Sequence, residues 1–249
     1  MFEQKPETLR EKVRLLATES VNKSDPTGWF DVLYSQAEGD ATQVPWARMT
    51  THPHLQDWLD KYPPVGNGNT ALVIGCGLGD DAEALSKYGF QVTGFDISPT
   101  AIAWCLQRFP NSSVTYQVAD LFNLDQNWVG AVEGAGFDMK HPVSSQRSSL
   151  NPPLHFDLVY ECRNIQALPL NVRAEAIKCV GKLVAPGGKL LVITRFQDND
   201  TPPDGPPWPL SEKELAQFQQ LGLQEVKRDV FFEGENNEVK QVRIEYLNG

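Results

Sequence analysis

Residues 71–81 read Ala-Leu-Val-Ile-Gly-Cys-Gly-Leu-Gly-Asp-Asp, an apolar stretch that runs into a glycine-rich turn closed by two aspartates. The apolar part predicts a buried strand, and the acids predict the first turn of a helix. A second strand, predicted over residues 91–95, ends in Asp96, about twenty residues after Gly75. In such a strand–turn–helix unit the glycines let the backbone approach a nucleotide, and the acid accepts hydrogen bonds from ribose hydroxyls.

The glycine spacing and the two aspartates discriminate between classes of nucleotide. The pattern G-x-G-x-G runs from Gly75 to Gly79, and Asp80 stands where a dinucleotide site has its third glycine. Carboxylates at the start of a helix stabilise its dipole but repel a pyrophosphate, which argues against a dehydrogenase. They suit S-adenosylmethionine, which carries a sulfonium and an ammonium. A P-loop is excluded because no Gly-Lys-Ser/Thr follows the turn.

Composition favours a small-molecule substrate. The chain has 249 residues and a formal net charge of −10, and it lacks the clustered Lys and Arg that phosphate contacts to nucleic acid need. The four cysteines show no C-x-x-C spacing, and no apolar signal or spanning segment opens the chain. We therefore expect a cytoplasmic protein with reduced thiols, a monomer that binds neither nucleic acid nor membrane.

Strands and helices alternate through the rest of the chain. We predict strands over residues 71–74, 91–95, 114–118, 156–160 and 189–194, and helices over 81–88, 99–109, 171–184 and 211–221. Two extended runs at the end, 224–232 and 239–246, predict an antiparallel hairpin. The expected fold class is α/β: a Rossmann-like, doubly wound, mostly parallel seven-stranded sheet with the hairpin at its edge.

We expect a single domain over residues 1–249 with a cofactor-binding core over 70–195. A helix over 6–21, whose simplest role is to cover one edge of the sheet, precedes a mostly irregular, aromatic-rich lid or wall that ends at 69. An irregular, Gly-, Ser- and Pro-rich insert over 123–155 is either a functional loop or disordered. Residues 196–249 form the substrate-side loop, a helix and the hairpin.

The order of G-C-G-x-G-x-D, an acid after the second strand and Ala-Asp-Leu-Phe after the third resembles class I S-adenosylmethionine-dependent methyltransferases, over about residues 70–195. Three flanking pieces resemble, more narrowly, the thiopurine S-methyltransferase and thiol/halide methyltransferase group. They are Phe-Asp-Val-Leu-Tyr at 30–34 with Pro-Trp at 45–46, Tyr-Glu-Cys-Arg-Asn-Ile-Gln-Ala-Leu-Pro at 160–169, and Gly-Pro-Pro-Trp-Pro-Leu-Ser-Glu-Lys-Glu-Leu at 205–215.

The resemblance implies S-adenosylmethionine as cofactor and S-adenosylhomocysteine as product. It implies a cofactor site in which the glycine turn borders the methionine part and the acid after the second strand binds the ribose. The residues after the third strand face the adenine, Tyr34 takes the place of a cofactor-covering Trp, and Trp46 belongs to a Pro-Trp wall. The expected cofactor-binding residues are Tyr34, Trp46, Gly75, Cys76, Gly77, Asp96, Ile97, Asp120, Leu121, Phe122 and Glu161.

Candidate catalytic residues are Glu161, Arg163 and Arg195, at the predicted ends of the fourth and fifth strands, where open α/β sheets bind ligands. Glu161 is a candidate base, a ligand of the cofactor's ammonium, or a helix cap. The arginines orient an anionic substrate, raise the thiolate fraction of a thiol, or serve in ion pairs. Bacterial thiopurine enzymes have an Asp-Arg pair where this chain has Glu161-Cys162, so the resemblance carries less weight there.

Further assignments concern structure rather than chemistry. We expect Asp81 to cap its helix, Ser98 to cap the next one, and Trp46 and Trp208 to form walls of the substrate pocket or simply to pack. His52 and His54 flank Pro53, but no further His or Cys pair completes a metal site, so no metal is expected.

Methyl transfer from a sulfonium is an in-line displacement, which mainly requires that nucleophile and methyl group be held close and aligned. We expect a small-molecule acceptor whose nucleophile is sulfur or another soft atom: a thiol, a thiopurine-like compound, a selenol or a halide. The alternatives are a small-metabolite O- or N-methyltransferase and a non-catalytic S-adenosylmethionine-binding protein.

Overall fold

The computed structural model describes residues 8–22, 25–62, 66–124, 155–199, 201 and 206–249. Most of the predicted insert therefore lies outside the described residues. The helices are α1 Leu9–Asn22, α2 Gly28–Gln36, α3 Pro53–Lys61, α4 Asp80–Lys87, α5 Pro99–Arg108, α6 Leu170–Lys182 and α7 Glu212–Gln220, with short 3₁₀ helices η1 Ala41–Gln43, η2 Leu121–Asn123 and η3 Ile165–Ala167. The strands are β1 Thr70–Ile74, β2 Gln91–Asp96, β3 Thr115–Val118, β4 Phe156–Cys162, β5 Val184–Gln197, β6 Leu210–Ser211, β7 Leu223–Glu233 and β8 Val239–Asn248.

The strands form one mostly parallel sheet in the order β3-β2-β1-β4-β5-β8-β7. The pairs β1–β2, β1–β4, β2–β3 and β4–β5 are parallel, whereas β8 runs antiparallel to both β5 and β7. The predicted α/β class and the hairpin at the edge are confirmed. β6, a two-residue strand that pairs with the end of β5, was not predicted.

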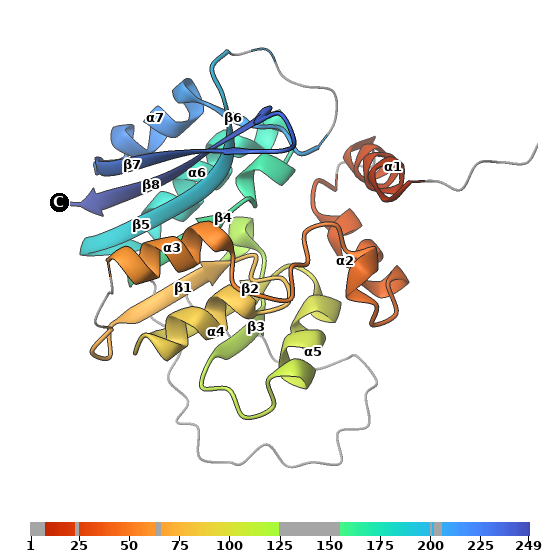
Figure 1. Cartoon of the computed structure of the whole chain (residues 1–249), viewed down its shortest axis with the longest axis horizontal. Coiled ribbons are helices and arrows are strands. Elements are labelled where there is room, and N and C mark those ends of the chain that lie inside the picture. The colour runs from red at the N-terminus through yellow and green to blue at the C-terminus, as the bar shows by residue number, and fades with distance from the viewer. Residues whose placement is uncertain (1–7, 23–24, 63–65, 125–154, 200, 202–205) are drawn as a thin grey trace, which may run out of the picture.

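Helices cover both faces of the sheet (Figure 1). In β1, Leu72 and Ile74 pack on the side of α6 and α7, while Ala71 and Val73 pack on the side of α3, α4 and α5. This alternation follows from the two-residue period of a strand, and burial on both faces explains why β1 reads as a continuous apolar run. The carboxyl ends of the parallel strands are therefore left as the edge at which a ligand binds.

The region before β1 is more helical than predicted. Residues 28–36, expected to be mostly irregular, form α2, and Trp29 and Leu33 lie one helical turn apart on its buried face. α1 packs on that face through Val13 and Ala17, so its partner is α2 and not an edge of the sheet. Figure 1 shows the two helices together at one side of the molecule. Among the described helices, none has the length and apolar character needed to cross a bilayer.

Candidate functional site

The turn between β1 and α4 requires glycine. Gly75 and Gly77 both have φ of +54°, in the left-handed region that side chains with a Cβ rarely adopt. A Cβ on Gly75 would lie 1.9 Å from the Asn164 side-chain oxygen, and one on Gly77 would lie 3.2 Å from the Tyr34 hydroxyl. The glycines thus let the segment that follows β4, and α2, approach the turn closely.

Asp96 ends β2 with its side chain beside this turn. Its carboxylate accepts hydrogen bonds from the Gly77 backbone N–H at 3.0 Å and from the Ser98 backbone N–H at 2.9 Å. The residue is 6% exposed, and burial raises the pKa of its carboxyl group to about 6. Ser98 caps α5 as predicted, since its hydroxyl accepts from the Ala101 N–H.

Two aromatic side chains stand over the turn. The Trp46 indole N–H donates to the Tyr34 hydroxyl at 2.7 Å, with the rings edge to face. Tyr34 is 2% exposed whereas Trp46 is 36% exposed, so Tyr34 is the inner residue of the pair. Burial raises the pKa of Tyr34, which keeps its hydroxyl neutral.

Asp31 fastens α2 to the start of α5. Its carboxylate accepts from the Ser98 hydroxyl at 2.6 Å and from the Thr100 N–H at 3.2 Å, so it supplements the N-cap of α5 from another helix. Since α2 carries Tyr34, this contact holds the aromatic cover against the turn that contains Asp96.

Replacing Asp31 with alanine is therefore expected to lower the free energy of unfolding by about 1–2 kcal/mol, because a charge-assisted cap is lost. Urea denaturation measures the change. Ser35→Ala is the matched control: it removes the neighbouring exposed contact between the Ser35 and Thr100 hydroxyls, 3.0 Å apart, and we expect a change within about 0.5 kcal/mol. Equal effects of the two variants would contradict the role given to Asp31.

The segment after β3 lies next to the glycine turn and Asp96 in the candidate site. Asp120 caps η2, because its carboxylate accepts from the Phe122 N–H at 2.9 Å and from the Asn123 side-chain amide at 2.7 Å. Leu121 and Phe122 are partly buried against the core on the α6 side. Asp120, Leu121 and Phe122 all line the same cavity.

One cavity of about 830 Å³ joins these elements. Its volume exceeds that of a single small acceptor and fits a cofactor with an acceptor beside it. It is lined by all the predicted cofactor residues except Glu161, and by both candidate arginines: Tyr34, Trp46, Gly75, Cys76, Gly77, Asp96, Ile97, Asp120, Leu121, Phe122, Arg163 and Arg195. Trp208 is not among the lining residues, although Pro206 and Pro207 are.

Glu161 lies outside the cavity lining, contrary to the expectation of a base or an ammonium ligand. Its side chain is fully buried, and one carboxylate oxygen accepts from the N–H groups of Asn164 and Ile165 at 2.7 and 3.0 Å. Burial raises its pKa to about 7. These contacts are those of a cap at the start of η3, while the second carboxylate oxygen is buried and has no hydrogen-bond partner among the described residues.

Asp81 also differs from its expected role. Gly79 is the N-cap residue of α4, while the Asp81 carboxylate accepts from the His52 backbone N–H at 2.7 Å and from the Tyr160 hydroxyl at 2.9 Å. It therefore ties the loop before α3 to β4. Sequence reasoning missed this because both partners are distant in the chain.

The two candidate arginines come from neighbouring strands. Arg163 follows β4 with φ of +65°, and its guanidinium donates to the Gln241 side chain and lies 3.4 Å from Glu233. Arg195 lies in β5, where its backbone N–H donates to the Gln166 side-chain oxygen at 2.7 Å. The parallel pairing of β4 and β5 brings both to the cavity.

The cavity also contains residues that the sequence analysis did not select, chief among them Arg48 and His52. His52 is 5% exposed, and its Nδ1 accepts from the His54 backbone N–H at 3.2 Å. Burial, together with the charges of Arg163 and Arg48, lowers its pKa to about 2, so the ring is neutral. The described residues contain no group of three or more His, Cys, Asp or Glu placed to hold a metal ion.

Comparison with known proteins places this geometry in a family. A model of the thiopurine S-methyltransferase family matches residues 36–247. A thiopurine S-methyltransferase of Aliivibrio fischeri is 25% identical over 183 residues, which cover 72% of this chain and 78% of that protein. A probable thiol methyltransferase 2 of Arabidopsis thaliana is 29% identical over 175 residues, covering 70% of this chain and 66% of that protein.

A solved structure shares the fold. The N-methyltransferase NodS of Bradyrhizobium japonicum WM9, in complex with S-adenosyl-L-homocysteine, aligns with a TM-score of 0.58 at 18% identity, covering 87% of this chain and 96% of that chain. The chain is an S-adenosylmethionine-dependent methyltransferase, and it belongs to the thiopurine S-methyltransferase family.

Proposed function

We propose that the protein methylates the sulfur, or another soft nucleophilic atom, of a small molecule. The related proteins named as thiopurine S-methyltransferase and probable thiol methyltransferase support a sulfur acceptor. S-adenosylmethionine supplies an electrophilic methyl group when bound. The residues around the glycine turn fit this cofactor, because Gly75 and Gly77 carry no Cβ and Asp96 offers a carboxylate for ribose hydroxyls.

The proposal rests on the side chains of the cavity that could act as a general base: its carboxylates and His52. Each carboxylate among the lining residues already accepts a hydrogen bond from within the described protein: Glu11 from Thr8, Asp80 from Arg108, Asp81 from His52 and Tyr160, Asp96 from Gly77 and Ser98, Asp120 from Phe122, and Glu238 from Asn236. His52 has a pKa of about 2 and does not take up a proton near neutral pH.

A site of this kind favours an acceptor that ionises without help. A thiol with a pKa of about 8.5 is already roughly 3% thiolate at pH 7, whereas an alcohol needs a positioned base. The residues after β4 and in β5 then have a positioning role: Arg163 and Arg195 attract the thiolate and hold it in line with the methyl group. Asp120, Leu121 and Phe122 are proposed to bind the adenine, and Tyr34 and Trp46 to cover the cofactor.

The deciding experiment offers the purified protein S-adenosylmethionine with matched acceptors. Thiophenol, phenol and aniline share one ring and differ in the nucleophilic atom. We expect methylation of the thiol and none of the other two. Methylation of phenol or aniline alone would replace the proposal with the O- or N-methyltransferase alternative.

Replacing Arg195 with alanine is expected to raise the acceptor KM about tenfold and leave the affinity for S-adenosylmethionine unchanged, because one cation near the thiolate is lost. Steady-state kinetics with thiophenol and calorimetric titration with the cofactor measure the two quantities. Arg228→Ala is the control, since Arg228 pairs with Glu212 and Glu225 and does not line the cavity. Equal loss of both affinities in the Arg195 variant would contradict this role.

A further inference from the structure

The acceptor end of the cavity carries more positive charge than binding one thiolate requires. Arg48 is an exposed residue that lines the cavity beside His52; the charges of Asp81 and Glu233 act on it, but its guanidinium forms no hydrogen bond or ion pair with the described residues. Arg163 lines the same end and has Glu233 as a counter-ion at 3.4 Å. A cation without a fixed partner on the wall of a binding cavity is suited to an anion that arrives with the ligand.

His52 adds a neutral hydrogen-bond donor at the same place. Its Nδ1 accepts from the His54 N–H, so in the neutral ring the proton sits on Nε2. Nε2 is buried, and no described residue accepts a hydrogen bond from it. A buried donor left unsatisfied costs free energy, so an anion bound next to it gains from the contact.

The charge of Arg48 acts on two nearby carboxylates, those of Asp81 and Glu233, but both have other partners. Asp81 is held by the His52 N–H and the Tyr160 hydroxyl. Glu233 lies 3.4 Å from both Arg163 and the His54 ring, and Glu238 accepts from the Asn236 N–H. Each of these acids is held by another residue, so the Arg48 guanidinium keeps its hydrogen-bond donors available for a ligand.

We propose that the acceptor carries an anionic group in addition to its nucleophilic sulfur, and that Arg48 and the Nε2–H of His52 bind this second group. The inference rests on the proposed function, because it concerns the acceptor of that reaction. It adds a substrate class: small thiol acids, of which a mercaptobenzoate is a simple example.

The test measures binding apart from turnover. Calorimetry compares 4-(methylthio)benzoate with its uncharged amide, each titrated into the full chain saturated with S-adenosylhomocysteine. We expect the acid to bind at least about tenfold more tightly than the amide, the gain typical of one charge-assisted hydrogen bond. In Arg48→Gln the two should bind within about twofold of each other, while Arg48→Lys retains part of the preference because it keeps the charge.

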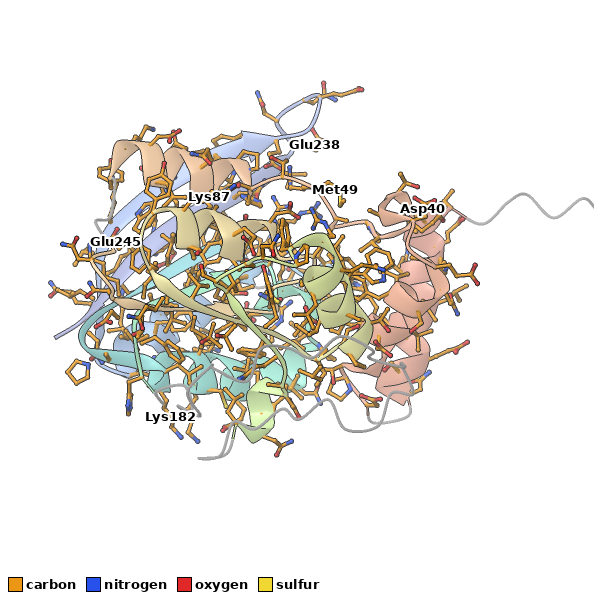
Figure 2. The ribbon with its side chains drawn as sticks, turned by 90° about the horizontal axis from the view of Figure 1, so that it is seen from below. Asp40, Met49, Lys87, Lys182, Glu238 and Glu245 are labelled. Atoms are coloured by element: carbon orange, nitrogen blue, oxygen red, sulfur yellow. The ribbon has the colours of Figure 1, made fainter. Side chains whose placement is uncertain are left out.

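Lys87→Gln controls for the loss of one positive charge. Lys87, labelled in Figure 2, is exposed at the end of α4. It does not line the cavity. This variant should keep the full preference for the acid. Equal binding of acid and amide by the unmodified protein, or an unchanged preference in Arg48→Gln, would overturn the inference.

Turnover separates the inference from the proposed function. The unmodified protein should methylate 4-mercaptobenzoate with a kcat/KM at least about tenfold above that for thiophenol. Arg48→Gln should remove this difference by lowering the kcat/KM for 4-mercaptobenzoate and leaving that for thiophenol unchanged. Methylation of both thiols at equal rates would overturn the inference and leave the proposed function intact. A preference for the acid in binding, with no methylation of either thiol, would support the anion site and overturn the sulfur acceptor.

Discussion

Asp96→Ala is expected to weaken S-adenosylmethionine binding roughly a hundredfold or more, as measured by calorimetric titration. The carboxylate is proposed to accept hydrogen bonds from the ribose hydroxyls, and each bond to a charged acceptor contributes about 1.5–3 kcal/mol. Alanine also deprives the N–H groups of Gly77 and Ser98 of their acceptor, so the turn itself is loosened.

Asp96→Asn removes the negative charge of the side chain while nearly keeping its size and shape. Asparagine keeps an acceptor oxygen for one backbone N–H, so we expect it to fold normally and still to bind the cofactor at least about tenfold more weakly. An Asn variant that binds S-adenosylmethionine as tightly as the unmodified protein would remove Asp96 from the proposed ribose site.

The pH dependence gives an independent check, because two quantities should move in opposite directions. The pKa of Asp96 in the folded protein is about 6, above its ordinary value of about 3.9, so its contribution to stability is present in acid and is lost as pH rises through 6. Cofactor binding needs the ionised form, so the Kd should be constant above about pH 7 and rise below 6. In Asp96→Asn the rise of the Kd below pH 6 should be absent. The loss of stability with rising pH should become smaller but remain, because burial also raises the pKa of Asp81 to about 6 and that of Glu161 to about 7.

The sheet could be predicted well because its signals are local. A run such as 71–74, buried on both faces, reads as apolar throughout, and a cap such as Ser98 with proline after it marks a helix start within two residues. α2 was missed because its Trp29–Leu33 spacing spans only one turn in a polar region, too short for a periodic pattern. Its stability comes from packing on α1 and from contacts with α5, which no local pattern records.

In the candidate site, too, one half could be predicted from local sequence signals and the other half could not. The cofactor half follows one strand–turn–helix unit and its neighbours, so Gly75, Gly77 and Asp96 could be chosen by position in the sequence. The acceptor half depends on the loop before α3 meeting the end of β4. Arg48 and His52 enter the cavity only through that tertiary contact, which the hydrogen bond from His52 to Asp81 helps to fix.

Gly75→Ala is expected to abolish measurable S-adenosylmethionine binding and to lower the free energy of unfolding by about 3 kcal/mol. A left-handed conformation costs an alanine about 1 kcal/mol. The new Cβ also meets the Asn164 side chain, which cannot move without losing its bonds to the Ile74 carbonyl at 2.8 Å and the Cys162 carbonyl at 3.2 Å. Breaking such buried bonds costs about 1–3 kcal/mol more.

Gly187→Ala isolates the backbone contribution to this loss. Gly187 has φ of +75° but nothing within 4 Å of an added Cβ, so its variant should lose only about 1 kcal/mol and bind the cofactor normally. Asn164→Ala, alone and combined with Gly75→Ala, completes a double-mutant cycle in urea denaturation. Since removing Asn164 removes the clash, the cost of Gly75→Ala in that background should fall to that of Gly187→Ala. A cost of Gly75→Ala that is the same with and without Asn164 would show that the left-handed turn, and not the contact with β4, is what requires glycine at this position.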